Sequence, residues 1–294
     1  MNSPNDLLHR FQLERAGVRG AFVRLERGWQ DLRSNGDYPG TLGELLGQAV
    51  AASALFTSTI KFDGRLSVQL QGNGPLRLLF AECTHDGCVR GIARWNGTPP
   101  AAPIRLDPQA RLAITIENLV TDTRYQGMVP VEGGDLAHAF ENYFERSEQL
   151  PTRVVLAEAD GRCGGLLLQQ VAREGGMGAV DDDGWNRVGH LLATVTPREL
   201  LELPPDQLLL RLFHDEDVRL QPPQPLVFAC TCSRERVEAM LRSLGRDEAD
   251  ATLAEQGSIE VHCEFCNRRY VFDDNDVADV FRAMESSPPL AKRH

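Results

Sequence analysis

Two stretches decide the fold of the C-terminal part of this chain: Phe228-Ala-Cys-Thr-Cys-Ser-Arg-Glu-Arg236 and Ile259-Glu-Val-His-Cys-Glu-Phe-Cys-Asn-Arg-Arg-Tyr-Val-Phe272. They contain a C-x-C pair and a C-x-x-C pair of cysteines, separated by thirty residues. Each pair supplies two thiolates from one turn, which suits a tetrahedral metal ion. Thiolates also suit iron–sulfur clusters and cuprous ion, but an all-sulfur set favours zinc. The predicted ligands of one zinc ion per chain are Cys230, Cys232, Cys263 and Cys266.

Residue patterns around both cysteine pairs indicate regular structure. Ser233 is a good helix N-cap, and apolar residues recur at helical spacing over Val237–Leu244 before Gly245 ends the pattern. The first pair is therefore expected at a helix N-terminus, where the helix dipole favours a thiolate. Strand-like residues over 258–262 and 269–272 predict a hairpin with the second pair in its turn. A final helix is expected to carry Val277, Val280, Phe281 and Met284 on one face.

The small size of the cysteine-containing segment makes its stability depend on the metal. Residues 228–284 are too few for a core alone to be the usual source of stability, whereas structural zinc contributes about 10–16 kcal/mol to small domains. Oxidation of either pair to a disulfide removes two of the four ligands, so the segment is suited to a reversible switch between folded and unfolded forms. Four arginines are available to offset the thiolate charge: Arg234, Arg236, Arg268 and Arg269.

The N-terminal part of the chain, residues 1–176, is predicted to be an α+β domain built mainly on antiparallel β-sheet. Apolar and polar residues alternate over Leu66–Leu70, a Gly-Asn-Gly-Pro turn follows, and Leu76–Phe80 begins the next run, which predicts a hairpin. Further strands are expected around residues 112–116, 153–156 and 166–168. Residues Leu42–Thr57 are apolar on most faces, which is typical of a helix packed against a sheet.

Residues 177–226 are predicted to form a metastable, proline-rich helical linker, and residues 227–294 a C-terminal zinc-binding domain. Glycines meet three consecutive acidic residues within 173–184, which marks the expected domain edge. Short helices are predicted over 185–195, 197–203 and 205–214, and such helices depend on packing for their stability. Three further prolines are expected to exclude any regular element: Pro222, Pro223 and Pro225.

Composition excludes several classes of partner. Lys and Arg number 31 against 42 Asp and Glu, a net charge of −11 that disfavours nucleic acid and anionic membranes. The longest uncharged stretch, residues 45–60, is too short and too polar to span a bilayer. The N-terminus shows no export signal, so we expect a cytoplasmic protein whose seven cysteines serve metal or redox chemistry. No nucleotide is expected, because Gly72-Asn-Gly74 lacks the rest of a phosphate loop.

Two other functions use similar cysteine motifs. A thiol-disulfide oxidoreductase needs its C-x-x-C at a helix N-terminus after a strand, whereas strand-like residues follow Cys266 here. A zinc-ribbon module that binds nucleic acid should be basic, yet residues 228–294 carry 9 basic and 13 acidic side chains. Cys83-Thr-His-Asp-Gly-Cys88 could form a second thiol or metal site with His85 between the cysteines, but these two are expected to be small buried hydrophobic residues instead. Cys163 belongs to no recognised motif.

The cysteine segments resemble the zinc-binding end of the thirty-three-kilodalton heat-shock protein family, which comprises redox-regulated cytosolic chaperones. The resemblance covers nearly the whole chain, because four N-terminal segments are also similar to that family: Gly40-Thr-Leu-Gly-Glu-Leu-Leu-Gly47, Gln71-Gly-Asn-Gly-Pro75, Tyr143-Phe-Glu-Arg-Ser-Glu-Gln-Leu-Pro151 and Gly164-Gly-Leu-Leu-Leu-Gln169. Some relatives have a further cysteine where Val237 stands here.

The resemblance implies a holdase that works without ATP and is not an enzyme. It implies that the reduced, zinc-bound protein is inactive and that oxidation pairs Cys230 with Cys232 and Cys263 with Cys266. Zinc then leaves, the linker and the C-terminal domain unfold, and the exposed apolar surface binds unfolding client proteins. The active form is expected to be a homodimer.

Overall fold

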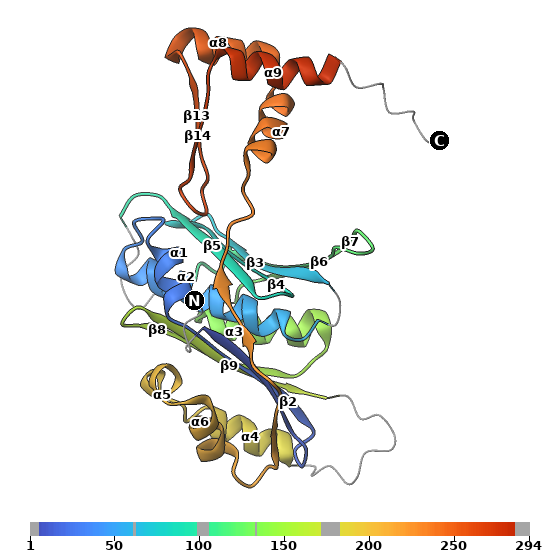
Figure 1. Ribbon diagram of the computed structural model, residues 1–294. Coiled ribbons are helices and arrows are strands. Elements are labelled where there is room, and N and C mark those ends of the chain that lie inside the picture. Colours follow the sequence, from blue (N-terminus) through green and yellow to red (C-terminus); the bar gives the residue numbers. More distant parts are fainter. Residues whose placement is uncertain (1–5, 61–62, 99–105, 133, 172–182, 286–294) are drawn as a thin grey trace. The chain divides into compact units, whose positions relative to one another are not determined.

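The computed structural model describes residues 6–60, 63–98, 106–132, 134–171 and 183–285 of the 294 (Figure 1). The chain divides into two compact units, Met1–Ala229 and Cys230–His294. The first unit combines two six-stranded sheets with helices, and the second combines a hairpin with three helices among its described residues. The predicted α+β class is confirmed.

The first sheet of the larger unit is antiparallel, with the strand order β10-β1-β2-β9-β8 and with β11 also paired to β1. It brings the N-terminal strands next to a hairpin from the middle of the chain, and the predicted strands near 153–156 and 166–168 are β8 and β9. The strand bounds are β1 Leu7–Leu13, β2 Val18–Leu25, β8 Thr152–Ala159, β9 Arg162–Gln170, β10 Val218–Leu220 and β11 Gln224–Pro225.

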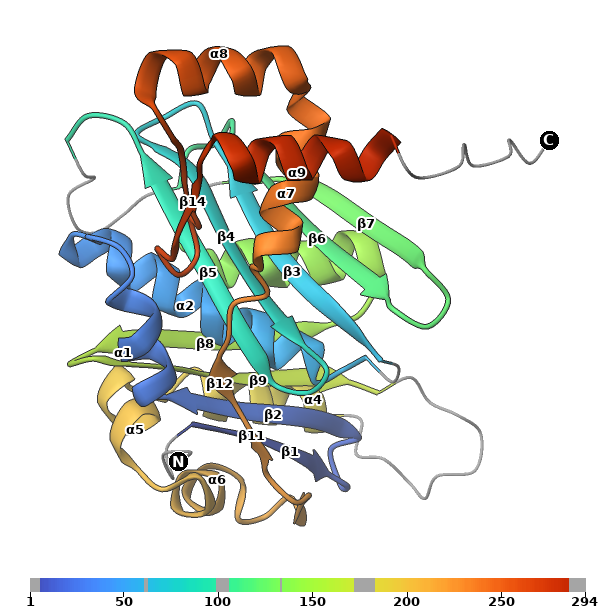
Figure 2. The ribbon, with the colours of Figure 1, turned by 45° about the horizontal axis from the view of Figure 1, so that its top comes forward.

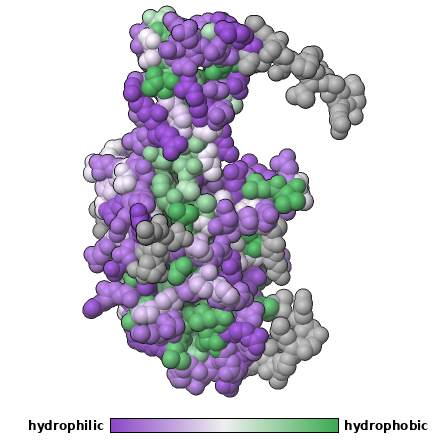
Figure 3. Space-filling view, in the orientation of Figure 1, coloured by the Kyte–Doolittle hydropathy of each residue, from purple (hydrophilic) through white to green (hydrophobic). Residues whose placement is uncertain are grey.

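The second sheet has the order β12-β5-β4-β3-β6-β7, antiparallel except that β12 runs parallel to β5. The predicted hairpin is β3–β4, and the strand expected at 112–116 is β6. The bounds are β3 Gly64–Gln71, β4 Leu76–Thr84, β5 Cys88–Trp95, β6 Arg111–Asn118, β7 Thr123–Pro130 and β12 Val227–Phe228. The β6–β7 hairpin exposes apolar side chains (Figure 3), namely Leu119, Val120, Tyr125 and Met128.

Helix α2, Gly40–Thr57, lies between the two sheets (Figures 1 and 2). Almost every residue from Leu42 onward is buried, which explains why its sequence is apolar on most faces. The packing against β5 is close: a Cβ at Gly91 would lie 2.9 Å from the Phe80 carbonyl oxygen and 3.1 Å from the Leu46 side chain. The same unit contains α1 (Arg27–Arg33), α3 (Leu136–Tyr143) and the π-helical turn η1 (Phe144–Glu148).

Three short helices pack on the face of the first sheet that points away from α2: α4 (Gly184–Leu192), α5 (Pro197–Glu202) and α6 (Pro205–Phe213). The three short helices predicted for this region are confirmed. The domain boundary expected within 173–184 lies mostly outside the described residues. A capping box between Thr196 and Glu199 starts α5. Their apolar faces join sheet side chains in one core: Phe11, Phe22, Leu168, Leu200, Leu209 and Phe213 are all buried there.

Two arginines tie this helical layer in place. The buried Arg24 of β2 donates from Nη2 to the carbonyl oxygens of Leu200 and Leu203, at the C-terminal end of α5. Arg187 of α4 donates from Nε to the buried Glu216 carboxylate at 2.6 Å. Hydrogen bonds to charged groups are stronger than neutral ones, so these contacts hold short helices that would be marginal alone.

The prediction that Pro222, Pro223 and Pro225 exclude any regular element is wrong in part. Pro222 and Pro223 lie outside any element, but Pro225 belongs to β11 and pairs with Leu7 of β1. Proline is tolerated there because β11 is only two residues long and lies at the sheet edge, where a missing N–H donor breaks no ladder. The Leu226 N–H then donates to the Asp6 carbonyl at 2.9 Å.

The second unit has a small core of its own. Helix α7 (Arg234–Leu244), the hairpin β13–β14 (Ile259–His262 and Arg269–Phe272) and α9 (Asp274–Glu285) agree with the predicted elements, although the Met284 side chain lies outside the described ones. Helix α8 (Arg246–Gln256) was not predicted. The core consists of Val237, Leu241, Ala249, Leu253, Ile259, Tyr270, Phe272, Val277, Val280 and Phe281.

Among the described residues, no helix has both the length and the apolar character needed to cross a membrane. Helix α2 contains most of the longest uncharged stretch of the sequence, and strands of both sheets cover its apolar faces.

Adjacent leucines in α6 allow a matched test of the helical layer. Leu209 is 1% exposed and lies in the core against the first sheet, whereas Leu210 is 65% exposed. Leu209→Ala should lower the free energy of unfolding by about 2–5 kcal/mol, because it leaves a cavity. Leu210→Ala should change it by less than about 0.5 kcal/mol. Urea denaturation, with limited proteolysis across 194–217, measures both; equal effects would contradict this packing.

Candidate metal centre

Two turns present the four cysteines of the second unit. Cys230 and Cys232 directly precede α7, where the Ser233 hydroxyl caps the helix by accepting from the Arg236 N–H at 3.3 Å. Cys263 and Cys266 lie in the turn of the β13–β14 hairpin. There the Asn267 N–H donates to the Cys263 carbonyl at 2.7 Å, and Asn267 adopts a left-handed φ of 53°. Asparagine tolerates this conformation, which lets the turn fold its two cysteines back toward the first pair.

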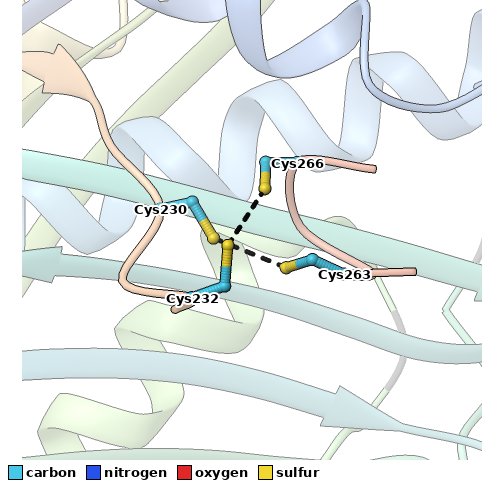
Figure 4. A group of neighbouring side chains, drawn as sticks. All are labelled: Cys230, Cys232, Cys263 and Cys266. Carbon is cyan, nitrogen blue, oxygen red and sulfur yellow. Dashed lines mark hydrogen bonds between the residues drawn. The ribbon is translucent and has the colours of Figure 1, made fainter. Parts of the chain in front are cut away.

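The structure brings all four predicted residues together (Figure 4). Their Sγ atoms lie within 4.8 Å of one another, with Cys230–Cys263 at 3.5 Å and Cys232–Cys266 at 3.3 Å. A tetrahedron with metal–sulfur bonds of about 2.3 Å has edges of about 3.8 Å. The four residues therefore fit a single ion with all-sulfur coordination, and all four are half-buried.

The sulfur atoms differ in their protonation chemistry. Burial opposes ionisation at Cys232, but the hydrogen bonds that its sulfur receives from Tyr270 and from the neighbouring thiols outweigh burial and lower its pKa to about 7. At Cys230, burial is the largest influence and raises the pKa. Ligand thiols must lose their protons when a metal binds, and Cys232 does so more readily than Cys230.

The predicted arginines contribute unequally to this centre. Arg268 interacts with the cysteine centre. Hydrogen bonding to Tyr270, together with the charges of Tyr270, Cys232 and Cys266, raises the pKa of its guanidinium. Arg234 instead pairs with Asp276 at 2.6 Å and lies over the Phe272 ring. Arg236 donates to the hydroxyl of Thr231, between the two cysteines of the first turn, and Arg269 pairs with Glu260 on the hairpin.

Tyr270 is a functional candidate that the sequence analysis missed. Its hydroxyl donates to the Cys232 Sγ at 3.2 Å, and the residue is only 8% exposed. The available signal was strand alternation: Tyr270 and Phe272 share the inward face of β14, so a polar tip points into the unit. The neighbouring His262 is exposed, and its Nε2 lies 4.0 Å from a Glu260 oxygen.

The other three cysteines lie in the first unit and do not form such a group within the described part of the chain. Cys83 in β4 is buried, as predicted, and so is Cys163 in β9. Burial raises the pKa of Cys83 to about 12 and also raises that of Cys163. Both thiols are therefore unreactive near neutral pH. The expectation that Cys88 is buried is wrong: it is half-exposed, because it begins β5 directly after a turn, and its Sγ lies 3.8 Å from Asp86.

Fold and site together define a protein that joins a large α+β scaffold to a small module able to bind a metal through four cysteines. The family model described as Hsp33 protein matches residues 6–273. The chain belongs to this family, and the resemblance inferred from its sequence is confirmed.

Individual relatives agree with this assignment. The 33 kDa chaperonin of Nitrosococcus oceani is 44% identical over 290 residues, covering 98% of this chain and 99% of the relative. That of Hahella chejuensis is 44% identical over 278 residues, covering 94% and 97%. The crystal structure of the 33 kDa chaperonin from Thermotoga maritima superposes with a TM-score of 0.83 at 22% identity, covering 96% of this chain and 100% of that one, which supports the fold. The predicted chaperone class is confirmed.

Removing one sulfur should weaken metal binding specifically. Cys263→Ser should lower the affinity for Zn²⁺ by more than about 100-fold, since even an outer-shell change typically costs 10–100-fold. Cys88→Ser removes a half-exposed thiol outside the centre and should leave affinity and stoichiometry unchanged. Titration of the reduced full chain against a chromophoric chelator measures both variants. Equal affinities for the two would refute the assignment of Cys263 as a ligand.

Proposed function

We propose that this protein is an oxidation-activated holdase that works without ATP. In the reduced, resting form one Zn²⁺ per chain is held by Cys230, Cys232, Cys263 and Cys266. Oxidation pairs Cys230 with Cys232 and Cys263 with Cys266, zinc leaves, and apolar surface becomes available to unfolding client proteins. The observation that carries this proposal is the convergence of four sulfurs from two separate turns in a small unit.

The metal is proposed to supply most of the order of the second unit. Cys232 and Cys263 pack against its core, so the sulfurs connect the start of α7 to the hairpin. That core has ten residues, which is small for a stable domain. Zinc contributes about 10–16 kcal/mol in such domains. When the thiols become disulfides, this contribution is lost and the unit unfolds.

The client-binding surface is proposed to come from a three-part arrangement: a core domain over 1–176, a metastable linker over 177–226 and a zinc-binding domain over 227–294. The linker ends just after β11, and β12 follows it before Cys230; each of these strands has only two residues. Strands so short add little stability. Release of α4–α6 would expose both halves of one apolar core: the helix leucines and the sheet side chains Phe11, Phe22, Leu166 and Leu168.

The proposed partners follow from this mechanism. Exposed apolar surface binds clients by the hydrophobic effect, so neither nucleotide hydrolysis nor a catalytic residue is needed. The thiols are consumed stoichiometrically in the switch, which makes the protein a chaperone and not an enzyme. A net charge of −11 disfavours nucleic acid and anionic membranes. The reduced resting state suits the cytoplasm, where reductants keep thiols reduced. The active form is proposed to be a homodimer.

The alternative of a thiol-disulfide oxidoreductase is less well supported. Its C-x-x-C would need to lie at a helix N-terminus, but Cys263 and Cys266 occupy a hairpin turn. A zinc-ribbon module that binds nucleic acid should be basic, whereas residues 228–294 carry 9 basic and 13 acidic side chains.

The proposal predicts that redox state controls protection of a client. The reduced, zinc-loaded chain should barely slow aggregation of a heat-denatured client, whereas peroxide treatment should release one zinc per chain, form two disulfides and suppress aggregation. Light scattering, zinc release and peptide mapping of disulfides measure the three events.

A matched control separates the switch from the other thiols. The triple variant Cys83→Ser, Cys88→Ser, Cys163→Ser keeps the four clustered cysteines and should be activated like the parent. Equal protection by the reduced, zinc-loaded and the oxidised parent would show that redox control is absent.

A further inference from the structure

A short segment of the first unit crosses the edges of both sheets (Figure 2). This strap, residues 224–229, contains β11 and β12 and leads directly into Cys230. Strand β11 pairs antiparallel with β1 of the first sheet, and β12 pairs parallel with β5 of the second. Within the described residues, the outer sides of β1 and β5 pair with no strand other than β10, β11 and β12. The strap therefore covers backbone groups that would otherwise form open sheet edges.

Backbone hydrogen bonds attach the strap to both sides. The Leu226 N–H donates to the Asp6 carbonyl at 2.9 Å, next to β1. The Val227 N–H donates to the Gly87 carbonyl at 3.0 Å, next to β5. Any residue except proline can donate such bonds, so this surface selects an extended backbone and not a particular sequence.

One side chain of the strap is deeply buried. Leu226 is 1% exposed and belongs to the main core of the first unit, whereas the adjacent Val227 is 45% exposed. The strap also lies directly on the β4–β5 turn. Gly87 has a positive φ of 92° there, and a Cβ on it would lie 2.3 Å from the Pro225 carbonyl oxygen. We call the outer edges of β1 and β5, together with the apolar site that Leu226 fills, the strap seat.

The strap is held by few contacts of its own. Its two strands have two residues each, which add little stability. The Gln224 side chain adds two bonds: its oxygen accepts from the Arg10 guanidinium at 2.8 Å, and its Nε2 donates to the His85 carbonyl at 2.6 Å. In the proposed function, the segments on both sides of the strap unfold on oxidation. The strap then loses the folded elements that fix its two ends.

We propose that the strap seat, once vacated, binds an extended segment of an unfolded client protein. The client backbone pairs with the edge of β1 or β5, and one apolar client side chain takes the place of Leu226. The strap is therefore an internal mimic of the client and blocks the seat in the resting protein. An unfolded chain fits this seat because backbone pairing requires an extended conformation and an apolar residue at only one position.

This inference rests on the proposed chaperone function and adds a second surface for the same clients. The apolar face beneath α4–α6 would bind client side chains by the hydrophobic effect, whereas the strap seat would also bind the client main chain. The two surfaces are distinct, so each can be tested separately.

The probe is a fluorescent peptide with the sequence of residues 222–229, whose binding to the full-length protein is measured by anisotropy. Leu226→Asp places a carboxylate in the apolar site and should unseat the strap. The reduced, zinc-loaded variant should then bind the peptide at least about tenfold more tightly than the reduced parent does, because a buried leucine side chain contributes that much or more. Val227→Asp makes the same change on the adjacent exposed side chain and should bind the peptide as weakly as the parent.

A second pair of variants keeps the test decisive if Leu226→Asp folds poorly. Gln224→Ala removes two hydrogen bonds of the strap without changing the core, so it should raise the affinity for the peptide by about threefold or more. Gln221→Ala changes an exposed side chain outside the strap and should leave the affinity unchanged.

Competition identifies the occupant of the seat. A reduced and alkylated protein that cannot refold should displace the peptide from the Leu226→Asp variant and from the oxidised parent. No gain in peptide binding in either strap variant, or binding that the unfolded protein cannot displace, would overturn the proposal. A change from dimer to monomer when the peptide binds, seen by analytical ultracentrifugation, would also overturn it, because a second copy would then be the occupant. Binding by the reduced variants requires no oxidation, so failure of the redox switch would be recognised separately.

Discussion

The convergence of four sulfur atoms from two turns is the constraint on which the C-terminal unit depends. The turn before α7 and the turn of the β13–β14 hairpin are far apart in sequence, and the cysteines lie where these two turns meet. The core of this unit has only ten buried apolar side chains. The free energy gained by burying them is small compared with the conformational entropy lost when more than fifty residues become ordered. In the proposed function, a metal ion held by the four sulfurs supplies the missing stability, and oxidation of the sulfurs removes it.

The first unit is stabilised in a different way. Helix α2 is buried between two six-stranded sheets, so its order depends on packing and not on a metal. The layer of α4–α6 is intermediate, because its helices are short and are held by one apolar face together with Arg24 and Arg187. Stability is therefore expected to fall from the well-packed core through the thin helical layer to the small unit with the four cysteines. A protein needs such a gradient if part of it is to unfold while the rest remains a scaffold.

Local sequence signals predicted much of this arrangement. Three signals each involve residues close together in the sequence: the spacing within each cysteine pair, the Ser233 cap and the apolar run of α2. The local structure that each one determines could therefore be predicted from the sequence alone. Helix α8 was missed because its apolar residues, such as Ala249 and Leu253, are few and form a weak stripe. The strand at Pro225 depends on an edge position next to β1, and the contact of Tyr270 with Cys232 spans 38 residues. The strand and the contact both arise from tertiary packing, which the periodicity and spacing of residues in the sequence do not predict.

The dependence of the C-terminal unit on its sulfur cluster is tested most directly by hydrogen–deuterium exchange on the reduced full-length chain, before and after zinc is removed with a chelator. The account predicts that amides of α7, α8, the β13–β14 hairpin and α9 lose protection on chelation and regain it when zinc returns, while those of α2 and the strands around it stay protected. Unchanged protection across residues 230–285 in the zinc-free protein would contradict it.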